Sequence, residues 1–318
     1  MDNLSPNKYS PHASRGILFC ALAAIFYTGA NTAVTELGRL GLHEFWIVGI
    51  KESITVLLLA PWCMMRMLHH KESRPDARMW AILLGAGLLT QLFGNVGYVY
   101  SLKVIGLAAT IPIVFASMLV MTALFGRLLL SEKVTIRSMA AIAMLVVAIC
   151  FITSGSDQVV GPLVEKSLFP AYRGLAILSS CVTGVCFGLM SIAVRHAMNR
   201  NVDKPIVMVI ITGVGFFLLV PAALYQEGTE LVTETTTVQW SWMISAGIFN
   251  LAAFFFLNKG LELTRVIHAN ITTSSQIAMA AVLGLLMFHE PLSTPLIIGV
   301  MLTIIGVLLI GGDEGEIM

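Results

Sequence analysis

Two oppositely charged residues, Lys51 and Glu52, lie inside an apolar stretch of the chain, residues 45–65. A charged side chain at the centre of a membrane costs about 2.5 to 3.5 kcal/mol unless it is compensated, so each is a candidate functional group. An ammonium group can hold an anion, and neighbours on a helix point about 100° apart, so we place Lys51 in a substrate pocket. Glu52 remains a candidate for coupling through proton transfer. The alternative is that Lys51 extends toward the membrane surface and Glu52 pairs with a neighbouring helix.

A second polar set follows helical spacing in the stretch 79–100. Gln91, Asn95 and Tyr98 recur at i, i+4 and i+7, which places them on one face of a helix. Asn31 adds a further amide from an earlier apolar stretch. Amide groups carry donors and acceptors that must be satisfied away from water, so we expect these residues to bind substrate. The alternative is interhelical hydrogen bonding that only holds the helices together.

A third candidate set is a pair of helix interruptions, at Pro112 and Asn270, which are 158 residues apart. Proline removes a helical hydrogen bond. Asn270 opens a polar run that includes Thr273 and Gln276, where side chains compete for backbone groups. Broken helices at matching positions of two repeats are typical of transport sites, so we expect these residues to line a cavity. The alternative is an ordinary kink at Pro112 and a packing face in the polar run.

The elements that must position these groups are apolar helices. The chain has 318 residues, 57% hydrophobic and 12% charged, with a mean hydropathy of +0.86, whereas soluble domains are about a quarter charged. We therefore predict an all-α membrane protein surrounded by lipid. Ten stretches are long enough to cross about 30 Å of hydrocarbon: 16–35, 45–65, 79–100, 106–130, 136–153, 174–194, 206–224, 240–258, 266–288 and 294–310.

The basic residues orient these ten transmembrane helices. With the N-terminus inside, fourteen Lys and Arg lie on inner segments and four on outer ones, and cytoplasmic loops carry the excess. We predict that both termini are cytoplasmic, in a multi-pass protein of the bacterial inner membrane. The net charge of +1 gives no basic surface for nucleic acid. The five cysteines lack CxxC spacing, so we expect no metal and no cofactor, and a homodimer is left open.

An internal repeat organises the chain. A shift of 158 residues aligns the ten stretches without a gap and places Ser117 on Ser275 and Glu132 on Glu290. Five helices in each unit require the second unit to be inverted, which is the architecture of secondary transporters. We predict two inverted five-helix repeats with the following divisions: N-terminal tail 1–15, first repeat 16–153, external linker 154–172, second repeat 173–311 and acidic tail 312–318.

We interpret Glu132 and Glu290 as structural and exclude them from the site. Each lies just before a new helix, where Thr135 or Ser293 can cap free N–H groups. A carboxylate also complements the positive end of a helix.

The last two helices of each half carry a resemblance. They read LFGRLLLSEKVTIRSMAAIAMLVVAICFI and VLGLLMFHEPLSTPLIIGVMLTIIGVLLI, each an apolar helix, a turn with Glu and a final helix. In this pattern the sequence resembles the EamA-type ten-helix permeases of the drug/metabolite transporter superfamily. Two features differ from the pattern of these permeases. The proline that usually precedes the glutamate is missing in both halves, and Lys51 occupies a position where arginine is frequent. The resemblance implies transport of small metabolites across a cytoplasmic membrane.

We therefore expect a secondary transporter that moves a small polar metabolite, amino-acid-like or another organic anion or zwitterion, by alternating access. A nucleotide-sugar or multidrug exporter of the same superfamily is an alternative. The sequence contains no GxxxxGK[ST] pattern for ATP and neither HExxH nor GxSxG for hydrolysis, so we expect no enzyme. An intramembrane enzyme, a channel or a receptor is the alternative of another class, but none of these requires an inverted duplication.

Overall fold

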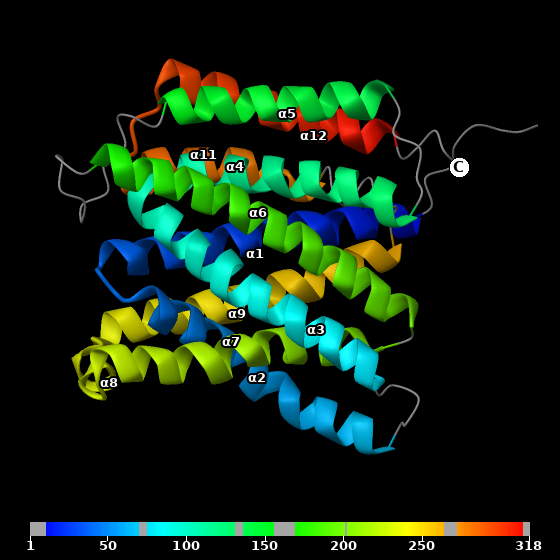
Figure 1. Cartoon of the computed structure of the whole chain (residues 1–318), viewed down its shortest axis with the longest axis vertical. Coiled ribbons are helices and arrows are strands. Elements are labelled where there is room, and N and C mark those ends of the chain that lie inside the picture. Colours follow the sequence, from blue (N-terminus) through cyan, green and yellow to red (C-terminus); the bar gives the residue numbers. More distant parts are fainter. Residues whose placement is uncertain are drawn as a thin grey trace, which may run out of the picture.

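The computed structural model describes residues 11–69, 75–130, 136–155, 169–200, 202–263 and 272–313. Within these ranges the chain is helical, without a strand, and most helices run roughly parallel or antiparallel to one another (Figure 1). Among the described residues six helices are long and apolar enough to cross a membrane, and three further apolar helices are shorter. The prediction of an all-α membrane protein is therefore confirmed.

The first half of the chain begins with two long helices and ends with α5. Its elements are α1 (Pro11–Arg39), α2 (Glu44–His69), α3 (Ala77–Leu89), the π-helix η2 (Thr90–Asn95), α4 (Val96–Leu130) and α5 (Ile136–Gly155). The start of α3 is capped by Asp76, whose Oδ1 accepts a hydrogen bond of 2.7 Å from Met79 N. Such a cap satisfies one of the free N–H groups of the first helical turn.

The second half is also helical throughout its described part. Its elements are α6 (Phe169–Asn199), α7 (Lys204–Glu227), α8 (Glu230–Glu234), α9 (Thr237–Leu263), α11 (Ser275–Phe288) and α12 (Thr294–Asp313). The predicted loop between the seventh and eighth stretches contains the short helix α8, and α7 has a proline in its first turn, where no N–H partner is needed.

The helix assigned as α4 is interrupted at Gly106, where φ is 76° and ψ is 178°. This backbone conformation is essentially restricted to glycine. The chain turns back there, so the cyan and teal ribbons of Figure 1 run in opposite directions. The predicted stretches 79–100 and 106–130 therefore form a tight helical hairpin, and one candidate span, Ala77–Met121, includes the first stretch and the second as far as Met121.

The non-helical backbone of α4 lies six residues before Pro112, where the sequence predicted an interruption. Gly106 is the non-helical residue within α4, while Pro112 is buried in its regular helical part. Proline is tolerated inside a membrane helix when neighbouring helices compensate the freed carbonyl group, so its presence alone does not locate a break.

The two halves of the chain interdigitate. The most extensive contacts join α1 to α9, α2 to α7, α4 to α6 and α5 to α12, and each pair takes one helix from each half. Small residues permit these approaches: a Cβ on Gly184 would lie 2.5 Å from Val114 O, and one on Gly299 would lie 2.9 Å from Ala148 O. The halves therefore form one bundle rather than two separate domains.

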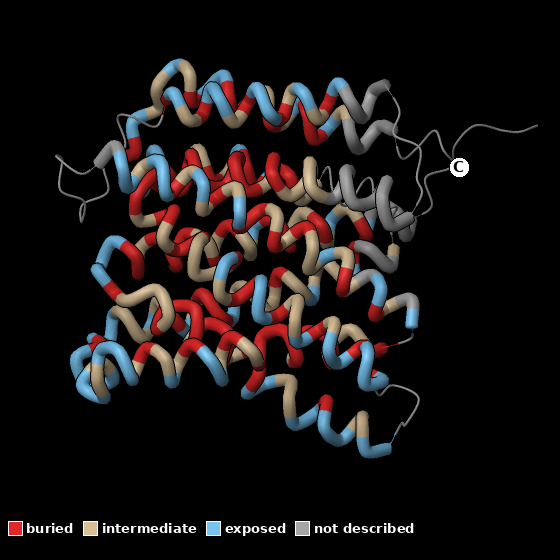
Figure 2. The backbone as a smooth tube through the Cα atoms, viewed as in Figure 1, coloured by how far each residue is buried: buried red, intermediate tan, exposed pale blue. Residues whose placement is uncertain are grey.

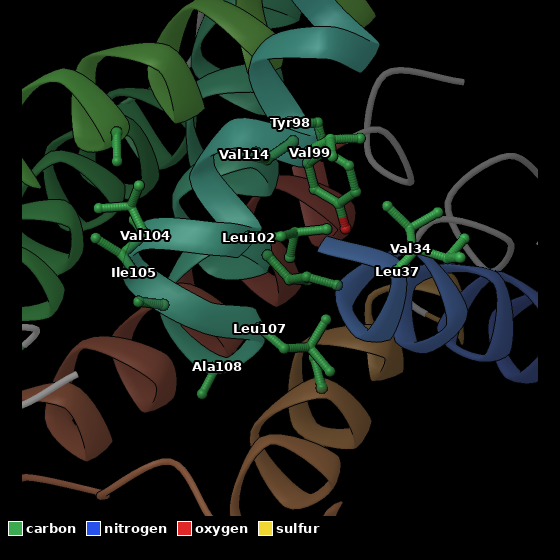
Figure 3. Packing of buried hydrophobic residues seen from close by; sticks show 14 of the residues in the cluster. Val34, Leu37, Tyr98, Val99, Leu102, Val104, Ile105, Leu107, Ala108 and Val114 are labelled. Carbon is green, nitrogen blue, oxygen red and sulfur yellow. The ribbon is translucent and has the colours of Figure 1, made fainter. Parts of the chain in front are cut away.

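Buried positions concentrate where the helices face one another, and exposed ones lie on the outside of the bundle (Figure 2). Near its centre, Val34 and Leu37 of α1 pack with Tyr98, Leu102 and Leu107 of α4 (Figure 3). The outward faces are also apolar, with exposed side chains that include Leu57, Phe217 and Leu286. An apolar exterior of this kind is suited to lipid.

Candidate functional site

The centre of the candidate site is an ion pair within α2. Lys51 Nζ lies 2.9 Å from Glu52 Oε1, and the two side chains are only 11% and 3% exposed. Lys51 Nζ also donates to Asn95 Oδ1 at 3.3 Å. The angular offset between adjacent residues suggested that the two would point apart, but the long lysine stem folds back to its neighbour. The charges thus compensate each other inside the bundle.

Two amide groups extend this ion pair into a longer chain of hydrogen bonds. Asn95 Nδ2 donates to Gln91 Oε1 at 2.8 Å, and Gln91 Nε2 donates to the backbone oxygen of Ile211 in α7 at 3.2 Å. Polar groups are therefore linked from α2 through η2 to α7. Because each amide oxygen already accepts a hydrogen bond, Gln91 and Asn95 hold a fixed orientation beside Lys51.

The two amides are carried by the π-helix η2, in which Val96 N donates to Gln91 O. This wider turn changes the register of the residues that follow it, and such bulges are frequent at functional sites. Beyond this turn, the centroid of the Tyr98 ring lies 6.3 Å from that of Phe187, and the Tyr98 side chain is directed toward α1 (Figure 3). Within the predicted stripe of three residues, Gln91 and Asn95 are joined by a hydrogen bond.

One atom of the ion pair has no partner. Glu52 Oε2 is buried and accepts no hydrogen bond within the described part of the chain. Leaving a buried polar atom unpaired costs about 1 to 3 kcal/mol. Tyr27 of α1 lies close enough to Glu52 to interact with it electrostatically. Glu52 Oε2 therefore has the capacity to accept a further hydrogen bond.

The remaining predicted residues come from α1 and from the region of α11. Asn31 is half-buried in α1, and its backbone oxygen accepts from Thr35 Oγ1 at 2.8 Å. Thr273 is half-buried just before α11, and Gln276 is 5% exposed within it. Asn270 is outside the described residues. Of the predicted set, the described structure brings together Lys51, Glu52, Gln91 and Asn95.

Gly215 of α7 is a site residue that the sequence did not reveal. A Cβ at this position would lie 2.8 Å from Gln91 Cδ and 3.1 Å from Glu52 Cγ. The missing side chain therefore makes room for both polar groups. With 27 glycines in the chain, only the packing of α7 against η2 and α2 distinguishes this one.

A second buried carboxylate, Glu290, lies at one end of the bundle and is 6% exposed. It accepts hydrogen bonds from Leu107 N at 2.7 Å and from Ala108 N at 2.9 Å. Burial raises the pKa of Glu290, an effect that these two donors and the charge of Arg39 oppose. The sequence assigned Glu290 to the start of the following helix, but its carboxylate instead caps the segment of α4 that begins after Gly106. Its equivalent, Glu132, is outside the described residues.

Comparison of the sequence with known families identifies the class of protein that contains these residues. The model of the EamA-like transporter family matches residues 14–154 and again residues 174–312. The chain belongs to the EamA-like transporter family. The resemblance seen in the two terminal helix pairs is therefore confirmed, and the family points to a membrane transporter rather than an enzyme.

Two further proteins are similar to this EamA-like transporter. Purine permease 21 from Arabidopsis thaliana is 22% identical over 199 residues, which cover 60% of this chain and 51% of that protein. The chain thus spans about half the length of this relative. A protein of known crystal structure aligns with a TM-score of 0.61 and 14% identity, covering 96% of this chain and 99% of the other. That likeness concerns the fold.

We predict that Gly215→Ala impairs this EamA-like transporter. The new Cβ would overlap Gln91, which must move and lose its bonds to Asn95 and Ile211. Overpacking costs about 1 to 3 kcal/mol, so transport should fall by about fivefold or more. Gly213→Ala is the matched control on the same helix, because the nearest atom there is 3.9 Å away. Equal transport by the two variants, measured in proteoliposomes, would contradict the role of Gly215.

Proposed function

We propose that this protein is a secondary transporter that moves a small polar metabolite across the cytoplasmic membrane by alternating access. The observation that carries this proposal is the buried pair Lys51–Glu52 inside α2, whose Glu52 Oε2 has no hydrogen-bond partner among the residues that the structure describes. Ionisable groups inside a membrane bundle are costly and are typical of substrate and ion pathways. The site residues come from α2 and η2 and contact α7, so both halves of the chain contribute to it.

The preferred substrate is an organic anion or zwitterion. Lys51 Nζ has three donors, of which Glu52 and Asn95 engage two. A substrate carboxylate would bind the ammonium group, and an ammonium group on the same substrate would bind Glu52 Oε2. Without substrate, Glu52 compensates Lys51, so we also propose Glu52 as the coupling carboxyl, which binds a proton when a substrate anion that has no ammonium group takes its place on Lys51.

A purine is the second candidate substrate, and the similarity to Purine permease 21 favours it. A nitrogen heterocycle with adjacent donor and acceptor atoms would also suit the site. Its N–H group would donate to Glu52 Oε2, and its ring nitrogen or carbonyl would accept from Lys51 Nζ.

The architecture that we propose is ten transmembrane helices arranged as two inverted repeats, 16–153 and 173–311. The hairpin at Gly106 supports the separation of the third and fourth spans. We retain six further candidates for the path through the bundle: Asn31, Tyr98, Pro112, Asn270, Thr273 and Gln276. The membrane would be the bacterial inner membrane, with both termini in the cytoplasm.

This topology makes a direct prediction. The basic segment from Arg66 to Arg78 should be cytoplasmic, whereas the acidic segment that contains Glu227, Glu230 and Glu234 should be external. Single cysteines placed in each segment would be exposed to an impermeant maleimide on intact cells. We expect labelling of the acidic segment alone, and labelling of the basic segment alone would reverse the orientation.

Uptake into proteoliposomes tests the function. The purified protein would be assayed with labelled amino acids, dicarboxylates, purines and sugars, with and without a pH gradient. We expect uptake of at least one anionic or zwitterionic solute above protein-free liposomes, accelerated by the pH gradient. Uptake of purines alone would favour the second candidate, and uptake of none with a folded protein would contradict the proposal.

A further inference from the structure

Glu290 joins the two halves of the chain at one end of the bundle. It follows α11 in the second half, while its partners Leu107 and Ala108 begin the second segment of α4 in the first half. A Cβ on Gly106 would lie 2.5 Å from Glu290 Oε1, and one on Gly284 would lie 2.6 Å from Oε2. The carboxylate therefore fits between a glycine of each half. We call this contact the Glu290 clamp.

Further contacts near the Glu290 clamp involve the end of α1, the end of α11, the turn in α4 and the start of α2. Arg39, the last residue of α1, donates to Phe288 O at 3.3 Å, and its guanidinium lies 5.2 Å from the centre of the Phe288 ring. Lys103, just before the turn in α4, forms an ion pair of 2.6 Å with Glu44 at the start of α2. The ends of α1 and α11 are thus held at the turn in α4, and the start of α2 is attached to the same turn.

Below the Glu290 clamp, α4 and α11 meet through small residues. A Cβ on Gly284 would lie 3.1 Å from the Ala108 side chain, and both Ala108 and Ala280 are completely buried. Small apolar side chains allow close contact but give it little directionality. The charge-assisted bonds of Glu290 are the directional interaction at this end of the interface.

We propose that Glu290 is a positioning residue. The Glu290 clamp closes this end of the substrate path, and the contact is released when the path opens there. Release separates the end of α11 from the second segment of α4. Water at the membrane surface then replaces the hydrogen bonds of the carboxylate and of the two N–H groups, so the contact can open and close repeatedly. The inference rests on the proposed function only in assigning this opening to transport.

Accessibility of a buried reporter tests the Glu290 clamp without any substrate. Ala280→Cys would be introduced into protein whose five native cysteines are replaced, and an impermeant maleimide would be applied to right-side-out and inside-out vesicles. We expect Glu290→Gln and Glu290→Ala to raise the labelling rate from one side only. Loss of one charge-assisted bond corresponds to about tenfold, and the Ala variant should exceed the Gln variant.

Two controls separate this role from general loosening of the fold. Ala148→Cys reports on the interface between α5 and α12, where labelling should stay unchanged. Glu132→Gln makes the same substitution at the equivalent position of the other half and should not raise labelling from the side that Glu290→Gln exposes. Unchanged labelling at position 280, or equal increases at positions 148 and 280, would overturn the inference. The labelling experiment contains no substrate, so its result does not depend on the result of the uptake assay.

Discussion

Lys51→Gln should reduce transport by about 100-fold or more in proteoliposomes. The substitution removes the ammonium group that would bind the substrate anion, and it leaves Glu52 as an uncompensated buried charge. Removal of one partner of a buried pair typically costs about 3 to 5 kcal/mol. Initial rates of uptake at saturating and subsaturating substrate measure the effect, and thermal unfolding in detergent measures the accompanying loss of stability.

The double variant Lys51→Gln, Glu52→Gln separates binding from folding. Without either charge the pair is neutral, so stability should recover while transport stays lost. Lys51→Arg should keep part of the transport, because the charge remains but its geometry changes. Normal transport by Lys51→Gln would show that the ammonium group has no role in binding and would remove Lys51 from the site.

Gly106→Ala should lower the free energy of unfolding by about 2 to 4 kcal/mol. A residue other than glycine with this backbone conformation costs about 1 to 3 kcal/mol. In addition, the new Cβ would lie 2.5 Å from Glu290 Oε1 and displace the carboxylate from Leu107 and Ala108. Chemical unfolding in detergent micelles, followed by circular dichroism, measures the change.

Gly85→Ala is the matched control for this prediction. Gly85 is helical in α3, and no heavy atom outside its own turn lies within 4 Å of the Cβ position. Alanine is favoured over glycine inside a helix, so this variant should be as stable as the parent protein or slightly more stable. Two variants of equal stability would show that the turn at Gly106 carries no strain.

The sequence was sufficient for features that depend on local composition. The lengths of the apolar stretches predicted where most helices lie. The cost of placing a charge in lipid identified Lys51 and Glu52 as candidate functional groups. The i, i+4 spacing of Gln91 and Asn95 was also enough, because their mutual hydrogen bond is formed within a single turn. Each of these features involves residues close together in the chain.

The features that the sequence did not predict depend on packing. A proline is the usual signal for a helix break, yet the turn occurs at Gly106, where the carboxylate of Glu290 compensates the free N–H groups. The π-helix that carries Gln91 and Asn95 has no sequence signature. The room at Gly215 exists only because α7 crosses beside Gln91. None of these could be derived from spacing within one segment.

The contact between Glu290 and Leu107 has a consequence for biogenesis. The two residues are 183 positions apart, and a ribosome adds about 5 to 20 residues per second. Roughly 10 to 40 s therefore pass between synthesis of Leu107 and Ala108 and synthesis of Glu290, the acceptor for their amides. Through this interval, water at the membrane surface is the alternative acceptor for the nascent helical hairpin. These two amides therefore reach their final hydrogen bonding only when nearly the whole second half has been inserted, which makes this step of maturation a late, whole-chain event.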